Sequence, residues 1–338
     1  MTPLVSILLP VRNGAATLPA ALASLAGQTF TDAELVAVDD GSTDASAERI
    51  ASCRLPFPVR LIRSDTPRGL VPALQAGLAA ARGALVARMD ADDVCHPERL
   101  QRQVARLCAG PELDLVACRV AFGGNRENAA GYARYVDWTN TLLTHEELAL
   151  ARFRESPLAH PSVLFRRTVL EQHGGYRDGD FPEDYELWLR WFEAGVRFAK
   201  LPETLLTWND PPDRLSRSHA RYRPAAFYAL KADYLARWLA AHNPLHPRIW
   251  VVGAGRVTRR RVDFLRARGI EVEAYLDLDP RKIGRRHHGA PVLHHDQVPP
   301  PGRTFVVPYV SSPGAADYLA QFLAARGYVR GRDFIEAA

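Results

Sequence analysis

A mostly apolar run that ends in three carboxylates constrains this 338-residue chain more than any other stretch. Residues 85–89 predict a buried strand, and Asp90, Asp92 and Asp93 follow it directly. Clustered carboxylates repel one another, so three of them at a strand tip indicate a compensating divalent cation. The alternative is a polar turn in which Asp92 or Asp93 caps the next helix. The stretch therefore predicts either a metal site or a helix cap.

The first hundred residues alternate predicted strands with predicted helices. The expected strands span 4–9, 34–38, 59–63 and 85–89. A helix over 70–82, closed by Gly83 as its C′ residue, precedes the last of them. Short apolar strands separated by helices are typical of a parallel sheet, and such sheets bind ligands outside the carboxyl ends of their strands. We therefore expect residues 10–13, 39–40 and 90–93 to meet at one sheet edge.

Composition excludes several classes of protein. Apolar residues make up 47% of the chain and charged residues 24%, and the formal charge of +5 permits an anionic ligand or a membrane-surface contact without requiring nucleic acid. The four cysteines form no CxxC pair, which argues against a zinc site or a disulfide framework. No membrane-spanning stretch or signal peptide is visible, so we expect a cytoplasmic protein, with room for peripheral contact at the inner face of the membrane.

The remainder of the chain gives weaker patterns. Residues 123–144 predict a loop whose aromatic side chains either line a site or pack in the core. Glu183 with Asp184 opens a helix whose dipole favours acids whatever the function. Residues 208–247 predict a connector: a basic loop, followed by a helix over 224–241. That loop either closes over an anionic ligand or is solvated, and the solvated interpretation is favoured. A second, smaller βαβ pattern begins at residue 249.

These motifs, in this order, resemble glycosyltransferase family 2, the inverting transferases of the GT-A fold. The matching segments are residues 5–13, 28–30, 38–44, 87–93, 159–166 and 183–184. The resemblance implies an α/β architecture: the GT-A nucleotide-diphospho-sugar transferase fold, with a mostly parallel central sheet flanked by helices, plus a small Rossmann-like C-terminal domain. The expected boundaries are 1–207 for the GT-A domain, 208–247 for a helical connector and 248–338 for the Rossmann-like domain.

The resemblance also implies roles for individual residues. Asp184 matches the catalytic base of the family. Asp92 matches the direct ligand of a divalent cation, Mg²⁺ or Mn²⁺, with Asp90 and Asp93 in support. The residues expected to bind the donor nucleotide are Pro10, Arg12, Asp39, Asp40, Arg68 and Asp90. The residues assigned to the acceptor side are His160, Glu183 and Trp188.

The implied activity is metal-assisted sugar transfer in polysaccharide biosynthesis. The donor would be a nucleotide-diphosphate sugar, with a UDP-sugar expected, and the acceptor a hydroxyl of a glycan or lipid-linked glycan. A departing diphosphate gains charge, which a hard divalent cation offsets, while a carboxylate takes the proton of the attacking hydroxyl. One displacement inverts the anomeric centre, with Asp184 as the base.

The C-terminal pattern suggests an alternative function. Gly253 and Gly255 match two glycines of a dinucleotide-binding motif, but Thr258 stands where the third is expected. Asp277 or Asp279, about twenty residues further on, could meet a ribose. A nicotinamide-dependent oxidoreductase or another nucleotide-binding activity in this domain is therefore the alternative, although a structural or protein-contact module is favoured. A nucleotidyltransferase would need a glycine-rich phosphate loop after the first strand, which is missing.

Overall fold

The computed structural model describes residues 2–212, 214–310, 312 and 314–338. By their internal contacts these residues form two units. The first comprises Met1–Leu148, Pro157–Gly179 and Glu183–His219, and the second comprises Ala149–Ser156, Asp180–Pro182 and Ala220–Ala338. The helix predicted for the connector therefore belongs to the second unit. Our three-part division of the chain at residues 207 and 247 remains a prediction.

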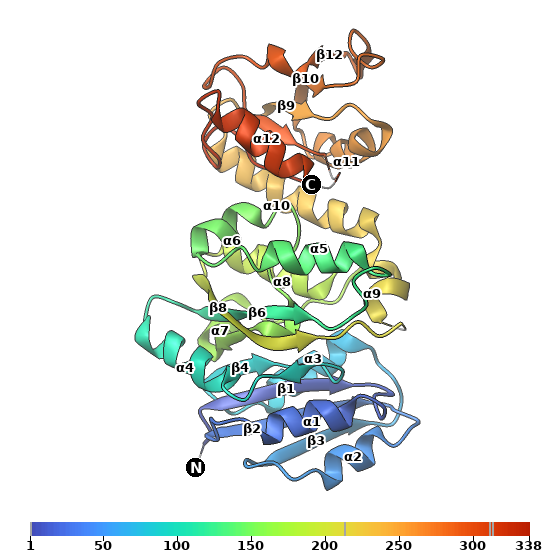
Figure 1. Cartoon of the computed structure of the whole chain (residues 1–338), viewed down its shortest axis with the longest axis vertical. Helices are drawn as coiled ribbons and strands as arrows, with labels where there is room; N and C mark the ends of the chain where they lie inside the picture. The colour runs from blue at the N-terminus through green and yellow to red at the C-terminus, as the bar shows by residue number, and fades with distance from the viewer. Residues whose placement is uncertain (1, 213, 311, 313) are drawn as a thin grey trace. The chain divides into compact units, whose positions relative to one another are not determined.

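In its described residues, the first unit contains an eight-stranded sheet in the order β3-β2-β1-β4-β7-β6-β8-β5 (Figure 1). Its strands are β1 Val5–Val11, β2 Ala33–Asp40, β3 Val59–Ser64, β4 Leu85–Arg88, β5 Val94–Cys95, β6 Leu115–Phe122, β7 Leu164–Arg166 and β8 Phe198–Trp208. Strands β1 to β4 are parallel, as are β6 and β8, whereas β7 runs antiparallel to β4 and β6, and β5 antiparallel to β8. The predicted mostly parallel sheet flanked by helices is confirmed.

Helices cover the sheet and connect its strands. Those along the chain to residue 219 are α1 Leu18–Ala26, α2 Ser46–Ser52, α3 Leu70–Ala80, α4 Arg99–Ala109, α5 Ala130–Thr139, α6 His145–Ala151, α7 Arg167–His173, α8 Glu183–Glu193 and α9 Leu215–Ser218. The predicted loop over 123–144 is wrong, because α5 lies within it. Tyr132 and Tyr135 are three residues apart and share a helix face, and their rings lie 6.2 and 5.9 Å from that of Trp208.

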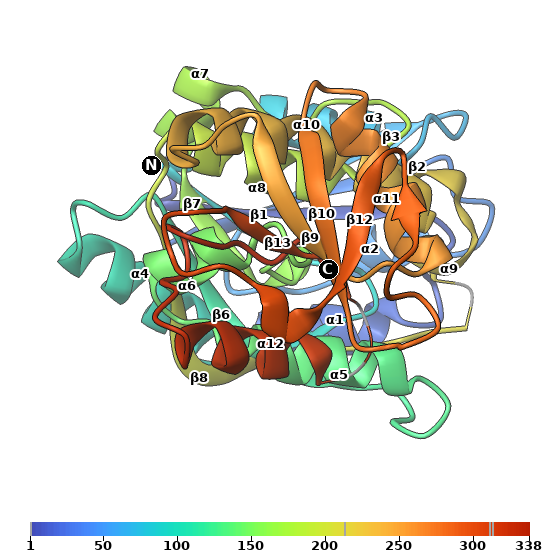
Figure 2. The same ribbon diagram turned by 90° about the horizontal axis from the view of Figure 1, so that it is seen from above.

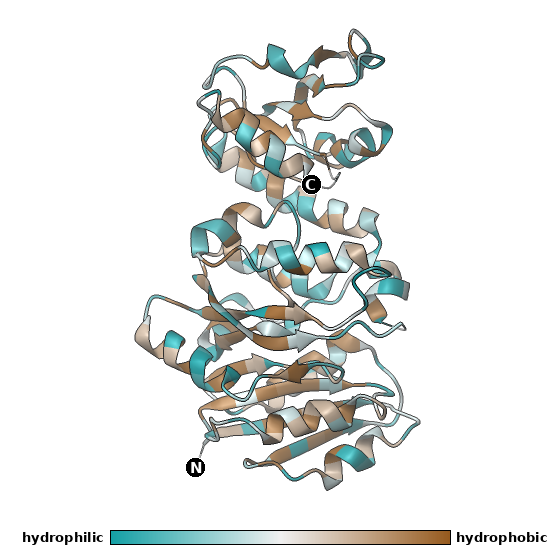
Figure 3. Ribbon diagram, viewed as in Figure 1, coloured by the Kyte–Doolittle hydropathy of each residue, from teal (hydrophilic) through white to brown (hydrophobic). Residues whose placement is uncertain are grey.

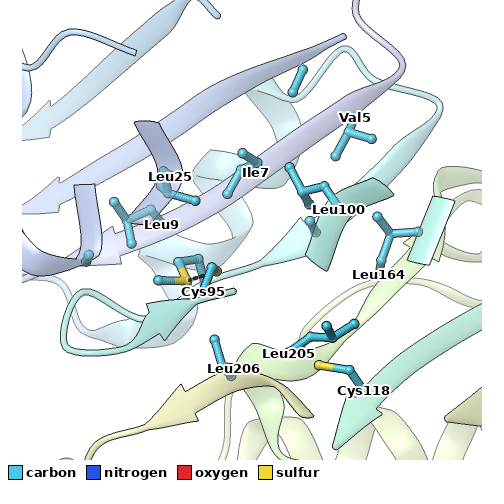
Figure 4. Packing of buried hydrophobic residues seen from close by; sticks show 14 of the residues in the cluster. Val5, Ile7, Leu9, Leu25, Cys95, Leu100, Cys118, Leu164, Leu205 and Leu206 are labelled. Carbon is cyan, nitrogen blue, oxygen red and sulfur yellow. Dashed lines mark hydrogen bonds between the residues drawn. The ribbon is translucent and has the colours of Figure 1, made fainter. Parts of the chain in front are cut away.

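The core of the first unit forms between this sheet and its helices. Strands β1, β2 and β4 are buried along their whole length. Figure 4 shows Ile7 and Leu9 of β1 with Leu25 of α1, Leu100 of α4 and Leu206 of β8 in one apolar cluster. In Figure 3 the apolar residues, in brown, concentrate in the strands, while hydrophilic residues follow the helices and loops. Because the strands are apolar on both faces, their polar residues can face solvent only at the strand ends.

The second unit contains a smaller sheet in the order β11-β12-β10-β9-β13. Its strands are β9 Arg248–Val252, β10 Glu271–Asp277, β11 Arg286–His287, β12 Ala290–His294 and β13 Val306–Pro308, and its long helices are α10 Pro224–His242, α11 Arg256–Arg266 and α12 Ala315–Ala324. Leu319 and Leu323 of α12 pack with Val252 and Leu276 on one face of the sheet. Figure 2 shows α10 and α11 beyond the other face. This arrangement agrees with the expected small α/β domain.

Among the described residues, no helix combines the length and the apolar character needed to cross a lipid bilayer.

Gly83 gives a test of how closely β1 is packed. A Cβ at this position would lie 2.5 Å from Ser6 N and 2.8 Å from Val5 C, both backbone atoms that cannot move aside. The glycine predicted as a helix C′ residue is therefore needed for this close approach. We expect Gly83→Ala to lower the free energy of unfolding by about 1–3 kcal/mol in a urea titration.

Gly131 is the matched control for that substitution. It lies inside α5, and a Cβ there would meet nothing within 4 Å. Gly131→Ala should stabilise the protein by about 0.5–1 kcal/mol, because alanine loses less conformational freedom than glycine when a helix forms. Equal effects of the two substitutions would contradict the packing argument.

Candidate active site

Strand register brings the polar strand ends of the first unit together. Leu8 of β1 pairs with Arg88 of β4, and Val11 of β1 pairs with Asp39 of β2. The residues that follow these pairs therefore leave the sheet at its carboxyl edge, as predicted for ligand-binding strand ends. A Cβ on Gly14, just beyond β1, would lie 3.6 Å from Cβ of Ala91, so the segment after β1 adjoins the acidic turn after β4.

The acidic turn holds three carboxylates close together. Oxygens of Asp90, Asp92 and Asp93 all lie within 4.8 Å of one another. Arg88 forms an ion pair with Asp90, with 2.5 Å between Nη2 and Oδ1. The backbone N–H of Asn209, just beyond β8, donates to Asp93 Oδ1 at 2.8 Å, and its side-chain amide donates to the carbonyl of Asp92 at 2.6 Å. The ion pair from Arg88 and the hydrogen bonds from Asn209 thus fix the orientation of the acidic turn.

The electrostatics of this turn fit a divalent cation. Burial, followed by the charge of Asp90, raises the pKa of Asp92 to about 6, and the same causes raise the pKa of Asp93 well above its usual value. Asp93 Oδ2 is buried and has no hydrogen-bond partner among the described residues. An unpaired carboxylate oxygen beside two others is a donor set suited to a hard cation. The helix-cap alternative is wrong, because the N-cap of α4 is Glu98.

Asp184 stands apart from this turn, in the first turn of α8. Burial raises its pKa from 3.8 to about 7, with further contributions from the charges of Glu183 and Asp90. The backbone N–H of Tyr185 donates to Asp184 Oδ1 at 2.7 Å. Glu183 is only 2% exposed. The contribution of Asp90 means that the acidic turn and Asp184 share one electrostatic environment.

The acceptor-side predictions fall on buried residues. His160 Nε2 lies 2.6 Å from the hydroxyl of Tyr176, and its ring centroid is 6.0 Å from that of Trp188. Burial and the charge of Arg88 lower the pKa of His160 well below its usual value, so the imidazole is neutral. Trp188 is fully buried. Both residues lie beneath the surface and support the site, and their assignment to the acceptor side remains a prediction.

The two donor-side acids have internal partners. Asp39 is fully buried and pairs with Arg63 at 3.2 Å. Asp40 accepts from the backbone N–H groups of Arg68 and Gly69 at 2.7 and 2.8 Å, just ahead of α3. Through these contacts both carboxylates hold in place the loops at the carboxyl edge of the sheet. Their contact with a nucleotide remains a prediction.

The other donor-side residues differ in exposure. Pro10 is buried, whereas Arg12 and Arg68 are exposed. The part of the chain that the structure describes has no ion pair between these two arginines and the acidic turn. Both guanidinium groups are therefore available to an anionic ligand, which is what their predicted role requires.

Sequence reasoning missed two residues that organise the site, and misjudged a third. Arg88 lies within the apolar run 85–89, and a positively charged residue in such a run itself indicates a nearby acidic partner. Asn209 gave no local signal. Arg214 belongs to the basic loop that was expected to be solvated, but its guanidinium lies 3.6 Å from the ring centroid of Trp208 and its side chain is only 17% exposed. The charge of Arg214 also lowers the pKa of Asp92, so it lies near the acidic turn.

Solved structures with a similar fold define the class. The Staphylococcus aureus protein TarS, residues 1–349 in complex with UDP, matches 70% of this chain and 72% of its own, with a TM-score of 0.51 and 20% identity. The mannosyltransferase PcManGT from Pyrobaculum calidifontis, in complex with GDP-Man and Mn²⁺, matches 71% of this chain and 64% of its own, with a TM-score of 0.50 and 20% identity. The fold is thus GT-A-like.

Sequence comparison gives the family. Residues 6–174 match the model of Glycosyl transferase family 2. An uncharacterized glycosyltransferase of Haemophilus influenzae is 31% identical over 54% of this chain and 66% of its own length. The amylovoran biosynthesis glycosyltransferase AmsE of Erwinia amylovora is 32% identical over 55% and 67%. The chain therefore belongs to glycosyl transferase family 2, a family of glycosyltransferases, and these alignments span about two thirds of each relative.

The raised pKa of Asp184 predicts a stability effect that depends on pH. The folded protein keeps this proton up to about pH 7, whereas the unfolded chain releases it near 3.8, so stability falls as pH rises between those values. Asp184→Asn removes the buried charge. We expect the variant to gain on the order of 4 kcal/mol over the wild type at pH 8 and little at pH 4, measured by urea unfolding.

Asp65→Asn serves as the control, because Asp65 is exposed. It should leave stability within about 0.5 kcal/mol at both pH values. A stability gain for Asp184→Asn that is the same at pH 4 and pH 8 would contradict burial of an ionisable carboxyl at this position.

Proposed function

We propose that this protein is an inverting glycosyltransferase that moves a sugar from a nucleotide-diphosphate donor to a hydroxyl of a glycan or lipid-linked acceptor. The observation that best supports this function is the pairing of an acidic turn with a separate carboxyl whose pKa lies near 7. A group with a pKa near the working pH is suited to remove a proton in the transition state. Asp184 is therefore the proposed base.

In the proposed reaction the acceptor oxygen attacks the anomeric carbon while the bond from that carbon to the diphosphate oxygen breaks. Asp184 takes the proton of the acceptor hydroxyl, and a single displacement inverts the anomeric centre. Arg88 fixes the orientation of Asp90 through their ion pair. Arg214, held on the ring of Trp208, contributes positive charge near the leaving group.

Asp92 is the proposed direct ligand of a divalent cation, with Asp90 and Asp93 in support. When bound, Mg²⁺ or Mn²⁺ would act as a Lewis acid and offset the charge of the departing diphosphate. The unpartnered Oδ2 of Asp93 supports this assignment. Arg12 and Arg68 extend the proposed donor site on its solvent side, with Pro10 and the loops held by Asp39 and Asp40 beneath them.

Relatives suggest the classes of donor and acceptor. Solved structures of similar fold are complexes with UDP, with UDP-GlcNAc, and with GDP-Man and Mn²⁺. Sequence relatives are named for the biosynthesis of amylovoran, of O-antigen and of succinoglycan. A UDP-sugar donor and a surface-polysaccharide acceptor are accordingly part of the proposal, as is a place of action at the cytoplasmic face of the membrane.

The alternative function in the C-terminal domain has less support. The carboxylate of Asp277 accepts from the backbone N–H groups of Ala254 at 2.7 Å and Asp279 at 2.9 Å. Lys282 lies 3.1 Å from the same carboxylate. A ribose would have to compete with these three partners. We therefore place the proposed activity in the first unit.

A melting-temperature screen tests the donor site. Nucleotide diphosphates and their sugars should raise the melting temperature of the wild type in the presence of Mn²⁺, because a ligand at 100 times its Kd stabilises by about 2.7 kcal/mol. Asp92→Asn should lose the part of this shift that requires the metal, and Asp184→Asn should keep it. If no nucleotide shifts the melting temperature with or without Mn²⁺, the donor-site assignment is wrong.

Transfer kinetics test the base. Asp184→Asn should lower kcat by about 10²–10⁴-fold, because the general base is lost. In the wild type, kcat/KM should rise with pH through about 7 as Asp184 loses its proton. The anomeric configuration of the product, read by NMR, should be opposite to that of the donor. Near-normal transfer by Asp184→Asn would exclude this residue as the base, and Asp65→Asn is again the matched control.

A further inference from the structure

One face of the second unit carries arginines that, among the described residues, form no ion pair with an acid. It is formed by α11 and by the hairpin of β11 and β12. The basic patch, as we call it, consists of Arg256, Arg259, Arg260, Arg285 and Arg286. Four of these side chains are exposed and Arg259 is half-buried.

Contacts between α11 and the hairpin make this one continuous patch. Arg259 Nη1 lies 3.0 Å from Nδ1 of His287, and His288 Nε2 lies 3.6 Å from Oδ1 of Asp263. Figure 2 shows the hairpin of β12 beside α11. Arginines from two segments about thirty residues apart therefore contribute to the same surface.

The positive charge of the patch is not neutralised. In the described parts of the chain, none of its five arginines forms an ion pair with a carboxylate. Elsewhere in the same unit arginines do pair with acids, as Arg268 does with Asp233 and Arg281 with Asp279. The charges of Arg259 and Arg285 add to burial in lowering the pKa of His287, which reflects the local positive potential.

Two exposed apolar side chains lie at the edge of the basic patch. Val257 is 59% exposed, between Arg256 and the rest of α11. Leu278 is 54% exposed and follows β10. Val257 lies in the first turn of α11, shortly after β9, and Leu278 directly follows β10. The ends of these two strands are neighbours, because Gly253 N–H donates to the carbonyl of Leu276 at 2.7 Å. Exposed apolar groups beside a cluster of cations are typical of surfaces that lie in a membrane interface.

We propose that the basic patch docks the second unit on the surface of an anionic lipid bilayer. The arginines would contact lipid phosphates, and Val257 and Leu278 would enter the headgroup region. A dissolved polyanion could satisfy the arginines but would offer no apolar environment to these two side chains, and this difference favours the bilayer. The proposed attachment is peripheral and reversible, through surface side chains alone.

Vesicle sedimentation with the whole protein tests the proposal. We expect binding to vesicles of 70% phosphatidylcholine and 30% phosphatidylglycerol, and none to pure phosphatidylcholine. Each arginine near such a surface contributes about fivefold in affinity. The triple variant Arg256→Gln, Arg260→Gln, Arg286→Gln should therefore bind on the order of 100-fold more weakly. Raising NaCl from 0.1 to 0.5 M should weaken wild-type binding.

Two further variants keep the test specific. Arg49→Gln, Arg54→Gln, Arg106→Gln removes the same charge from exposed positions of the first unit and should bind as the wild type does. Val257→Ser with Leu278→Ser should bind anionic vesicles about tenfold more weakly while binding dextran sulfate unchanged. Melting temperatures confirm that each variant is folded.

Three outcomes would overturn the proposal. The first is no binding of the wild type to anionic vesicles. The second is an equal loss of binding in the two triple variants. The third is binding to dextran sulfate that exceeds vesicle binding at matched charge, with no effect of the two serine substitutions, since this would identify a dissolved polyanion as the partner.

Discussion

The ion pair between Arg88 and Asp90 is the interaction on which the candidate site depends. Arg88 is 1% exposed and sits at the end of an apolar strand, where an unpaired guanidinium would cost several kcal/mol. Its pairing with Asp90 at 2.5 Å compensates for part of that cost. The same charge adds to burial in lowering the pKa of His160. The buried guanidinium of Arg88 therefore influences both the acidic turn and the residues packed beneath α8.

The acids of the sheet edge fall into two groups by how far their oxygens are satisfied. Asp39 and Asp40 accept hydrogen bonds on both carboxylate oxygens, and they fix loops. Asp92, Asp93 and Asp184 have pKa values raised by burial, and Asp93 has an oxygen without a partner. Carboxyl groups with pKa values raised by burial and by neighbouring acids lower stability, and such groups cluster at sites that serve a ligand or a reaction. This contrast separates proposed site residues from supporting ones on physical grounds.

Sequence patterns predicted what depends on local periodicity, and missed what depends on distant packing. The apolar runs predicted the strands and the sheet edge at which their polar ends meet, because a buried strand is recognised from consecutive apolar residues. Asn209 could not be foreseen, because its hydrogen bond to Asp93 joins residues 116 positions apart. Helix α5 was missed because the turn-forming residues before it outweighed the three-residue spacing of its aromatic side chains. Arg214 was misjudged because cation–π packing on Trp208 leaves no local signature.

The two units contain clusters of opposite charge, negative in the first and positive in the second, and each cluster indicates a different partner. In the first unit clustered carboxylates favour a cation, and in the second clustered arginines favour an anion. If the acceptor is lipid-linked, docking of the second unit on the bilayer raises the effective concentration of that acceptor without any new contact to the sugar. Such docking would favour transfer to membrane-bound acceptors over free ones even if the first unit bound both equally. Acceptor preference would then depend partly on the second unit as well as on the sugar-transfer site of the first.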